Sequence, residues 1–138
     1  MNLRKSLLRR PLRAIALLAT ATVLASGCIG LEQRERELTF RPSHSEATWY
    51  SGLPSGVQEL TLPVDARPDA PRISAWWWPD DDATAPVVLY LHGARWNLTG
   101  HLNRIAQLRE FGFSVFAIDY RGFGKSDGDL PSEATVYE

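Results

Sequence analysis

Residues 86–94 read PVVLYLHGA and residues 116–128 read FAIDYRGFGKSDG, and these two stretches set the architecture of the 138-residue chain. The apolar runs at residues 87–91 and 113–118 are typical of strands buried on both faces of a parallel sheet. Between them, residues 99–110 carry apolar side chains at helical spacing, with Thr99 as the predicted cap and Gly112 as the predicted stop. Strand, helix and strand in this order predict a right-handed parallel crossover.

Two further strands are predicted before this unit. Residues 57–64, VQELTLPV, alternate apolar and polar side chains, as a half-buried antiparallel strand does. Residues 73–78, ISAWWW, form the second strand, and the connection between the two contains Pro68, which indicates a hairpin-type turn. Pro131 marks the expected start of another helix. The sequence therefore predicts an α/β fold in which two antiparallel-type strands lead into a parallel βαβ unit.

The first 28 residues have the pattern of an export signal. Five basic residues precede an apolar run of twelve at residues 14–25, which is too short to span a bilayer comfortably. The run leads into Leu24-Ala-Ser-Gly-Cys28, which resembles the bacterial lipoprotein box, in which the cysteine is lipidated and becomes the first mature residue. This resemblance implies a signal peptide over residues 1–27, lipidation of Cys28 and a protein held on a membrane of the cell envelope. Ile29 favours the periplasmic face of the outer membrane, and export by the general or the twin-arginine route stays open.

The alternative for this segment is an ordinary secretory signal with an incidental cysteine. Cys28 is the only cysteine of the chain, so no disulfide can form within it. Without residues 1–27 the chain has 10 basic and 16 acidic residues, a net charge of −6. Nucleic-acid binding requires a basic face, so this function is excluded. We divide the remainder into a polar tether at residues 28–55 and a folded domain at residues 56–138.

An apolar strand that runs into His92-Gly93, a helix, and a strand that opens into Asp119-Tyr-Arg-Gly-Phe-Gly-Lys-Ser126 resemble the front half of an α/β-hydrolase. The resemblance is to the serine aminopeptidase-like and lipase-like branch. In that family the loop after the third strand supplies a backbone N–H to the oxyanion hole. The resemblance makes the amide of Ala94 this donor, with Gly93 leaving room for the substrate and His92 holding the turn through hydrogen bonds. One such donor is worth about 2.7–4 kcal/mol of transition-state stabilisation.

The catalytic triad of that family follows the order Ser, acid, His, so His92 and Asp119 come too early to belong to it. Ser126 lies in a G-x-S-x-G pattern, yet it stands eight residues after Ile118 and no helix follows it directly. We therefore predict a loop serine bonded to nearby backbone. A phosphate-binding loop is excluded because Asp119 stands where its first glycine would be. The resemblance places the nucleophile, acid and histidine downstream, so we interpret the chain as a fragment or early-terminated product, inactive alone.

The resemblance implies a membrane-tethered serine hydrolase that cleaves a small-molecule ester, or alternatively an amide or peptide bond. The competing hypotheses are a non-catalytic lipoprotein that uses the same scaffold for binding, and a truncated product that never folds stably. No cofactor or metal is expected, because no His, Cys, Asp or Glu cluster has metal-ligand spacing. His101 is assigned a surface or capping role, and residues 80–82, three aspartates, a solvated turn.

Overall fold

The structure, a computed structural model, describes residues 30–137, and every structural statement below concerns these residues. The predicted signal peptide and Cys28 lie outside them. Within this range the chain divides into two units, with the boundary between Glu35 and Arg36. Residues 30–40 are helical, so the start of the predicted tether is more regular than its charge-rich sequence indicated. The site described below lies within the second unit.

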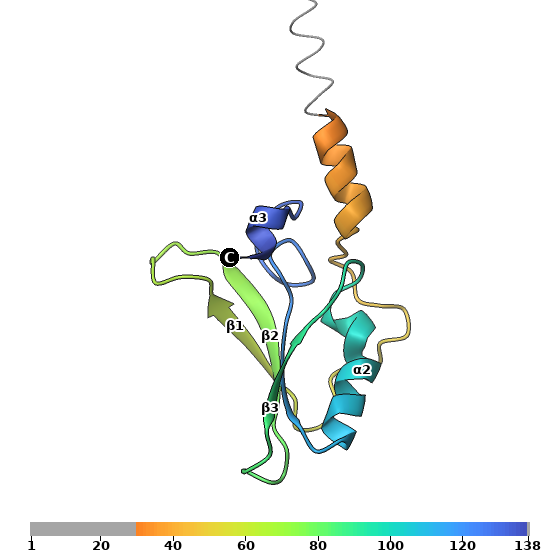
Figure 1. Ribbon diagram of the computed structural model, residues 1–138, viewed down its shortest axis with the longest axis vertical. Coiled ribbons are helices and arrows are strands. Elements are labelled where there is room, and N and C mark those ends of the chain that lie inside the picture. The colour runs from red at the N-terminus through yellow and green to blue at the C-terminus, as the bar shows by residue number, and fades with distance from the viewer. Residues whose placement is uncertain (1–29, 138) are drawn as a thin grey trace, which may run out of the picture. The chain divides into compact units, whose positions relative to one another are not determined.

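Four strands form one mixed sheet in the order β1-β2-β4-β3, and Figure 1 shows it beside α2. β1 (Gln58–Pro63) and β2 (Arg72–Trp78) are antiparallel, β2 also pairs antiparallel with β4 (Ser114–Ile118), and β4 is parallel to β3 (Val87–Leu91). The crossover from β3 to β4 passes through α2 (Leu98–Glu110). Both the predicted antiparallel pair and the predicted parallel βαβ unit are confirmed.

α2 and the short helix near the end of the described chain both begin at polar N-caps. Asn97 caps α2 by accepting a hydrogen bond from the Thr99 amide, so the prediction of Thr99 as the cap is wrong by two residues. Asn97 is the last residue before the helix, so its side-chain oxygen can accept from a free amide of the first turn. The Thr99 hydroxyl is itself a donor to this oxygen. α2 ends where predicted, with Gly112 at φ +84°, a left-handed conformation that glycine adopts without strain. α3 (Glu133–Val136) follows Pro131 and is capped by Ser132.

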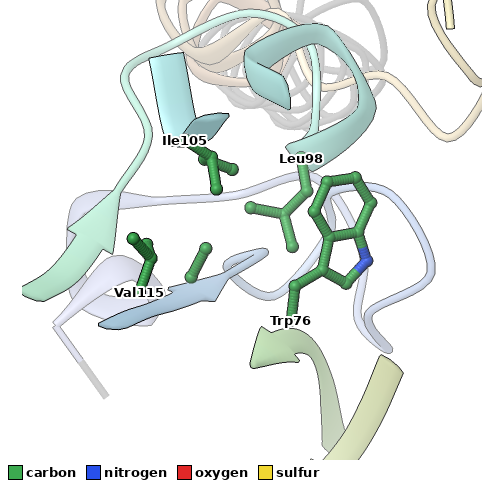
Figure 2. Packing of buried hydrophobic residues seen from close by; sticks show 5 residues of the cluster. Trp76, Leu98, Ile105 and Val115 are labelled. Carbon is green, nitrogen blue, oxygen red and sulfur yellow. The ribbon is translucent and has the colours of Figure 1, made fainter. Parts of the chain in front are cut away.

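α2 packs on one face of the sheet and forms the hydrophobic core there. Figure 2 shows Leu98 and Ile105 of α2 directed toward the side chains of β2 and β4. The cluster comprises Trp76, Leu98, Ile105, Val115 and Ala117, all at most 3% exposed. Complete burial of one large aliphatic side chain contributes about 1.5–3 kcal/mol, so this cluster fixes the helix against β2 and β4, and β4 carries the second motif loop.

The opposite face of β3 is open, which corrects the prediction that residues 87–91 are buried on both faces. Val87, Leu89 and Leu91 are 61%, 56% and 50% exposed. Strand side chains alternate between faces, and α2 covers only the face that carries Tyr90. The sequence pattern was that of a strand covered on both sides, but α2 packs on one face only, and on the other Leu91 alone of these three residues lines a cavity with residues of α3. An apolar patch of this kind is typical of a surface that another element or partner covers.

Candidate functional site: the oxyanion loop

The loop after β3 and the loop after β4 meet at one edge of the sheet, because parallel neighbouring strands end on the same side. A cavity of about 150 Å³ lies there. It is lined by His92, Gly93 and Ala94 from the first loop and by Tyr120 and Phe123 from the second, and the remaining lining residues are Thr39, Phe40 and Val136. All three residues that the sequence analysis placed at the oxyanion loop therefore line one cavity.

His92 lies at the base of this cavity, with its side chain completely buried. Its Nδ1 atom is 2.8 Å from the carbonyl oxygen of Gly93, and its Nε2 atom is 3.1 Å from Oδ1 of Asp119. The rings of Tyr120 and Phe123 meet the imidazole edge-on, each with a centroid distance of 5.0 Å. The imidazole is thus hydrogen-bonded through Nδ1 to its own loop, whereas Nε2 faces Asp119 without forming a hydrogen bond, and the role of His92 in holding the turn stays a prediction.

The bond from His92 to Gly93 fixes the direction of the Ala94 amide. The carbonyl of Gly93 and the N–H of Ala94 belong to the same planar trans peptide unit, so they point in opposite directions. Because the carbonyl turns toward the buried imidazole, the N–H turns away from it. Among residues 30–137, no protein group accepts a hydrogen bond from this N–H. The site therefore presents a free backbone donor beside a cavity.

Asp119 connects the two loops and the helix. Its Oδ1 atom accepts a hydrogen bond of 2.9 Å from the amide of Leu98, the first residue of α2, besides facing His92. A carboxylate at a helix N-terminus also interacts favourably with the helix dipole. The backbone carbonyl of Asp119 accepts a bond of 2.7 Å from the Ser126 hydroxyl. The backbone of Asp119 therefore ties down the loop that follows it, and its carboxylate is directed to His92 and α2.

Ser126 is engaged on both sides and is not an exposed nucleophile. The residue is 6% exposed. Its hydroxyl donates to the Asp119 carbonyl and accepts a bond of 2.9 Å from the amide of Ser74 in β2. The reading of Ser126 as a loop serine bonded to nearby backbone is confirmed, and its G-x-S-x-G pattern is a coincidence of spacing.

The predicted surface or capping role of His101 is wrong. His101 is 9% exposed, its Nδ1 atom is 3.0 Å from the hydroxyl of Tyr90, and its ring stacks on His92 with centroids 5.4 Å apart. Burial lowers the pKa of His101 from its ordinary value of 6.5. The helix turns this side chain toward the sheet rather than the solvent, so His101 packs against His92 of the oxyanion loop and against Tyr90 of β3.

The three aspartates at residues 80–82 also depart in part from the solvated turn that was expected. Asp82 is exposed and bonds to Thr84 within the turn, whereas Asp80 is largely buried and pairs with Arg109 of α2. Within residues 30–137, no group of three His, Cys, Asp or Glu side chains is arranged to hold a metal ion. Nor does any helix in this range have the length and apolar character needed to cross a membrane.

Known proteins are similar in sequence to parts of the chain. No protein-family model matches it. The uncharacterized protein YfhR of Escherichia coli (strain K12) is 37% identical over 74 residues, covering 51% of this chain and 26% of that protein. The YfhR protein of Salmonella typhi is 29% identical over 92 residues, covering 63% of this chain and 30% of that protein.

Among solved structures, the alpha-beta hydrolase from Vibrio vulnificus matches with a TM-score of 0.60 and 21% identity, covering 78% of this chain and 38% of that one. The fold is that of an α/β-hydrolase. More specifically, the chain forms the opening portion of the α/β-hydrolase sheet, with two antiparallel strands before the parallel βαβ unit. It spans between a quarter and two fifths of the length of the relatives named here.

The sequence analysis found the loop but missed several of its supports. Phe40 and Val136 line the cavity although they lie far from either motif in sequence. The sequence analysis gave Asn97 no role, yet it is 3% exposed and fully bonded. Its position two residues before Thr99 at a helix start was the one signal that could have identified it.

Proposed function

We propose that this chain is the N-terminal part of a membrane-tethered α/β-hydrolase, and that the Ala94 amide stabilises the oxyanion formed when an ester bond is attacked. The attacking group is a serine that residues 30–137 do not supply, since Ser126 is bonded on both sides. A developing negative charge on the former carbonyl oxygen is stabilised by donors already aimed at its position. The likeness in fold supports this function at the level of the scaffold.

One observation carries the proposal: the Ala94 N–H has no acceptor among the described residues, and it belongs to a loop that lines a cavity of about 150 Å³. Ala94 is exposed, so water can occupy this donor when the cavity is empty, and a substrate oxygen can take the place of that water while the His92–Gly93 bond holds the peptide unit in one direction. Tyr120, Phe123 and Phe40 give the cavity an aromatic wall, which suits an uncharged organic ester better than an ionic substrate.

The proposal includes attachment to the outer membrane on its periplasmic side through acyl chains on Cys28. Acyl chains contribute about 0.8 kcal/mol per buried methylene, so several chains hold a protein on a bilayer where one does not. Metabolic labelling with a palmitate analogue tests this attachment, and Cys28→Ser is the variant that should lose the label. A labelled Cys28→Ser protein would contradict it.

Substitution of Ala94 by proline tests the oxyanion role, because proline has no N–H and the preceding Gly93 tolerates its steric demands. In the full natural polypeptide, we expect Ala94→Pro to lower kcat for p-nitrophenyl acetate about 100- to 1,000-fold, with KM nearly unchanged. Ala83→Pro, in the exposed turn before β3, is the matched control and should retain wild-type activity.

Fluorophosphonate labelling of the same polypeptide separates the enzyme from its alternative. Covalent labelling together with ester hydrolysis supports the hydrolase. A folded wild-type protein that neither labels nor hydrolyses esters contradicts it and favours a lipoprotein that uses the scaffold for binding. Unchanged kcat in a folded Ala94→Pro variant would assign the oxyanion to another donor.

A further inference from the structure

The segment at residues 40–47, which we call the strap, crosses both loops of the site before the chain enters β1. The Arg95 amide donates a bond of 2.9 Å to the Phe40 carbonyl, and Pro42 forms a parallel bridge with Trp96. The other loop is held as well, since the Gly124 amide donates a bond of 2.9 Å to the carbonyl of Ser43. The strap is therefore bonded to the loop after β3 and to the loop after β4.

One side chain joins the strap to the site. Nδ2 of Asn97 donates to the carbonyls of Ser43 and Ser45, at 3.0 and 2.9 Å. Oδ1 of Asn97 accepts from the amide and the hydroxyl of Thr99, at 3.0 and 2.6 Å. An asparagine amide has two donor hydrogens and one acceptor oxygen, and here all of them are used. The two ends of the amide thus serve different purposes, because the oxygen caps α2 and the nitrogen holds the strap.

The strap crosses the loop where its backbone is most strained. Arg95 and Trp96 have φ values of +75° and +62°, left-handed conformations that residues with side chains rarely adopt. Such conformations persist only where the surroundings over-determine them, and they gather at functional sites. Both residues lie between Ala94 and Asn97, and they are restrained by the strap, through the Arg95 amide and the Pro42–Trp96 bridge, and by a longer contact of 3.5 Å from His101 Nε2 to the Arg95 carbonyl. Trp96 also meets Trp49, just beyond the strap, edge-on at 4.8 Å.

We propose that Asn97 is a positioning residue: through its two bonds to the strap it keeps residues 95–96 left-handed and thereby keeps the Ala94 amide directed at the cavity. The consequence for catalysis rests on the oxyanion role proposed above, whereas the consequence for loop structure does not. His92 sets the direction of this amide from inside the protein, and the strap sets it from outside.

Asn97→Asp separates the two ends of the amide. The carboxylate retains an acceptor for Thr99, and aspartate is as good a helix cap as asparagine, so α2 should remain intact. The variant loses both donors to the strap and places an oxygen against two carbonyl oxygens. Asn103→Asp makes the same change of charge at an exposed position of α2 and is the matched control.

Residue-resolved amide hydrogen exchange on the full natural polypeptide tests the structural part. In Asn97→Asp we expect the Arg95 and Gly124 amides to exchange about tenfold faster or more, the effect of losing one net hydrogen bond. The Val115 amide in β4 and all amides of Asn103→Asp should exchange at the wild-type rate. Unchanged exchange at Arg95 and Gly124 overturns the proposal, because Asn97 would then have no effect on the two loops. Equal acceleration at Val115 also overturns it, because Asn97 would then stabilise the whole fold and not these loops in particular.

Ester hydrolysis by the same variants tests the catalytic part. Loss of donor orientation acts on the transition state, so kcat for p-nitrophenyl acetate should fall about tenfold with KM nearly unchanged. Faster exchange at Arg95 with an unchanged kcat overturns the positioning of the Ala94 amide. If the wild-type polypeptide hydrolyses no ester while Arg95 and Gly124 exchange faster in Asn97→Asp, the structural role of Asn97 is supported and the hydrolase assignment is contradicted.

Discussion

Removal of the Asp119 carboxylate should destabilise the protein strongly, because this one buried group serves a helix, an imidazole and a loop. In Asp119→Ala the buried Leu98 amide loses its acceptor at 2.9 Å, which costs about 1–3 kcal/mol. The lost interaction with the α2 dipole adds about 0.3–1 kcal/mol. The completely buried side chain of His92 also loses the carboxylate that lies 3.1 Å from its Nε2 atom. We expect a decrease of about 2–4 kcal/mol in the free energy of unfolding.

Asp119→Asn separates the hydrogen bond from the charge. The amide oxygen retains an acceptor for Leu98, so only the charge-dependent part is lost, about 1 kcal/mol. Urea unfolding at pH 7, followed by the fluorescence of buried Trp76, measures both variants. Asp69→Ala, at an exposed position in the β1–β2 turn, should change stability by less than about 0.5 kcal/mol. A cost below about 1 kcal/mol for Asp119→Ala, or equal costs for the two Asp119 variants, would refute this reasoning.

Two further measurements address neighbouring parts of the site. Burial lowers the pKa of His101, so below about pH 6.5 the unfolded chain binds more protons than the native state and stability decreases as the pH falls. Between pH 7 and 5.5, His101→Gln should flatten this decrease and His44→Gln, at an exposed histidine, should not; parallel curves would contradict the assignment. Gly124 has φ +53° and a Cβ there would collide with the Asp119 carboxylate, whereas Gly52 has φ +109° and open space. Both Gly→Ala variants should lose about 1 kcal/mol to backbone strain, with about 1–3 kcal/mol more for Gly124→Ala; equal urea midpoints would show that the collision is relieved.

The local patterns of the chain predicted its strands and helices well. The alternation at residues 57–64 and the apolar runs at residues 87–91 and 113–118 gave strand limits within one residue of those observed. His92-Gly93 and the Asp119-to-Ser126 stretch placed the two loops at one sheet edge, because parallel strands joined by one crossover must end together. These inferences needed only periodicity and spacing along the chain.

Long-range packing decided what those patterns could not. The apolar run of β3 indicates coverage on both faces, but coverage depends on distant elements, and residues 30–137 supply it on one face only. His101 and Thr99 were assigned from their place near a helix start, whereas their partners, Tyr90 and the strap residue Ala47, come from elsewhere in the sequence. Strand and helix limits are set by neighbours in the chain, so the sequence determined them. The pairing of His92 with Asp119, the strained turn at residues 95–96 and the role of Asn97 depend on residues 27 to 55 positions apart, and only the tertiary structure brings these together.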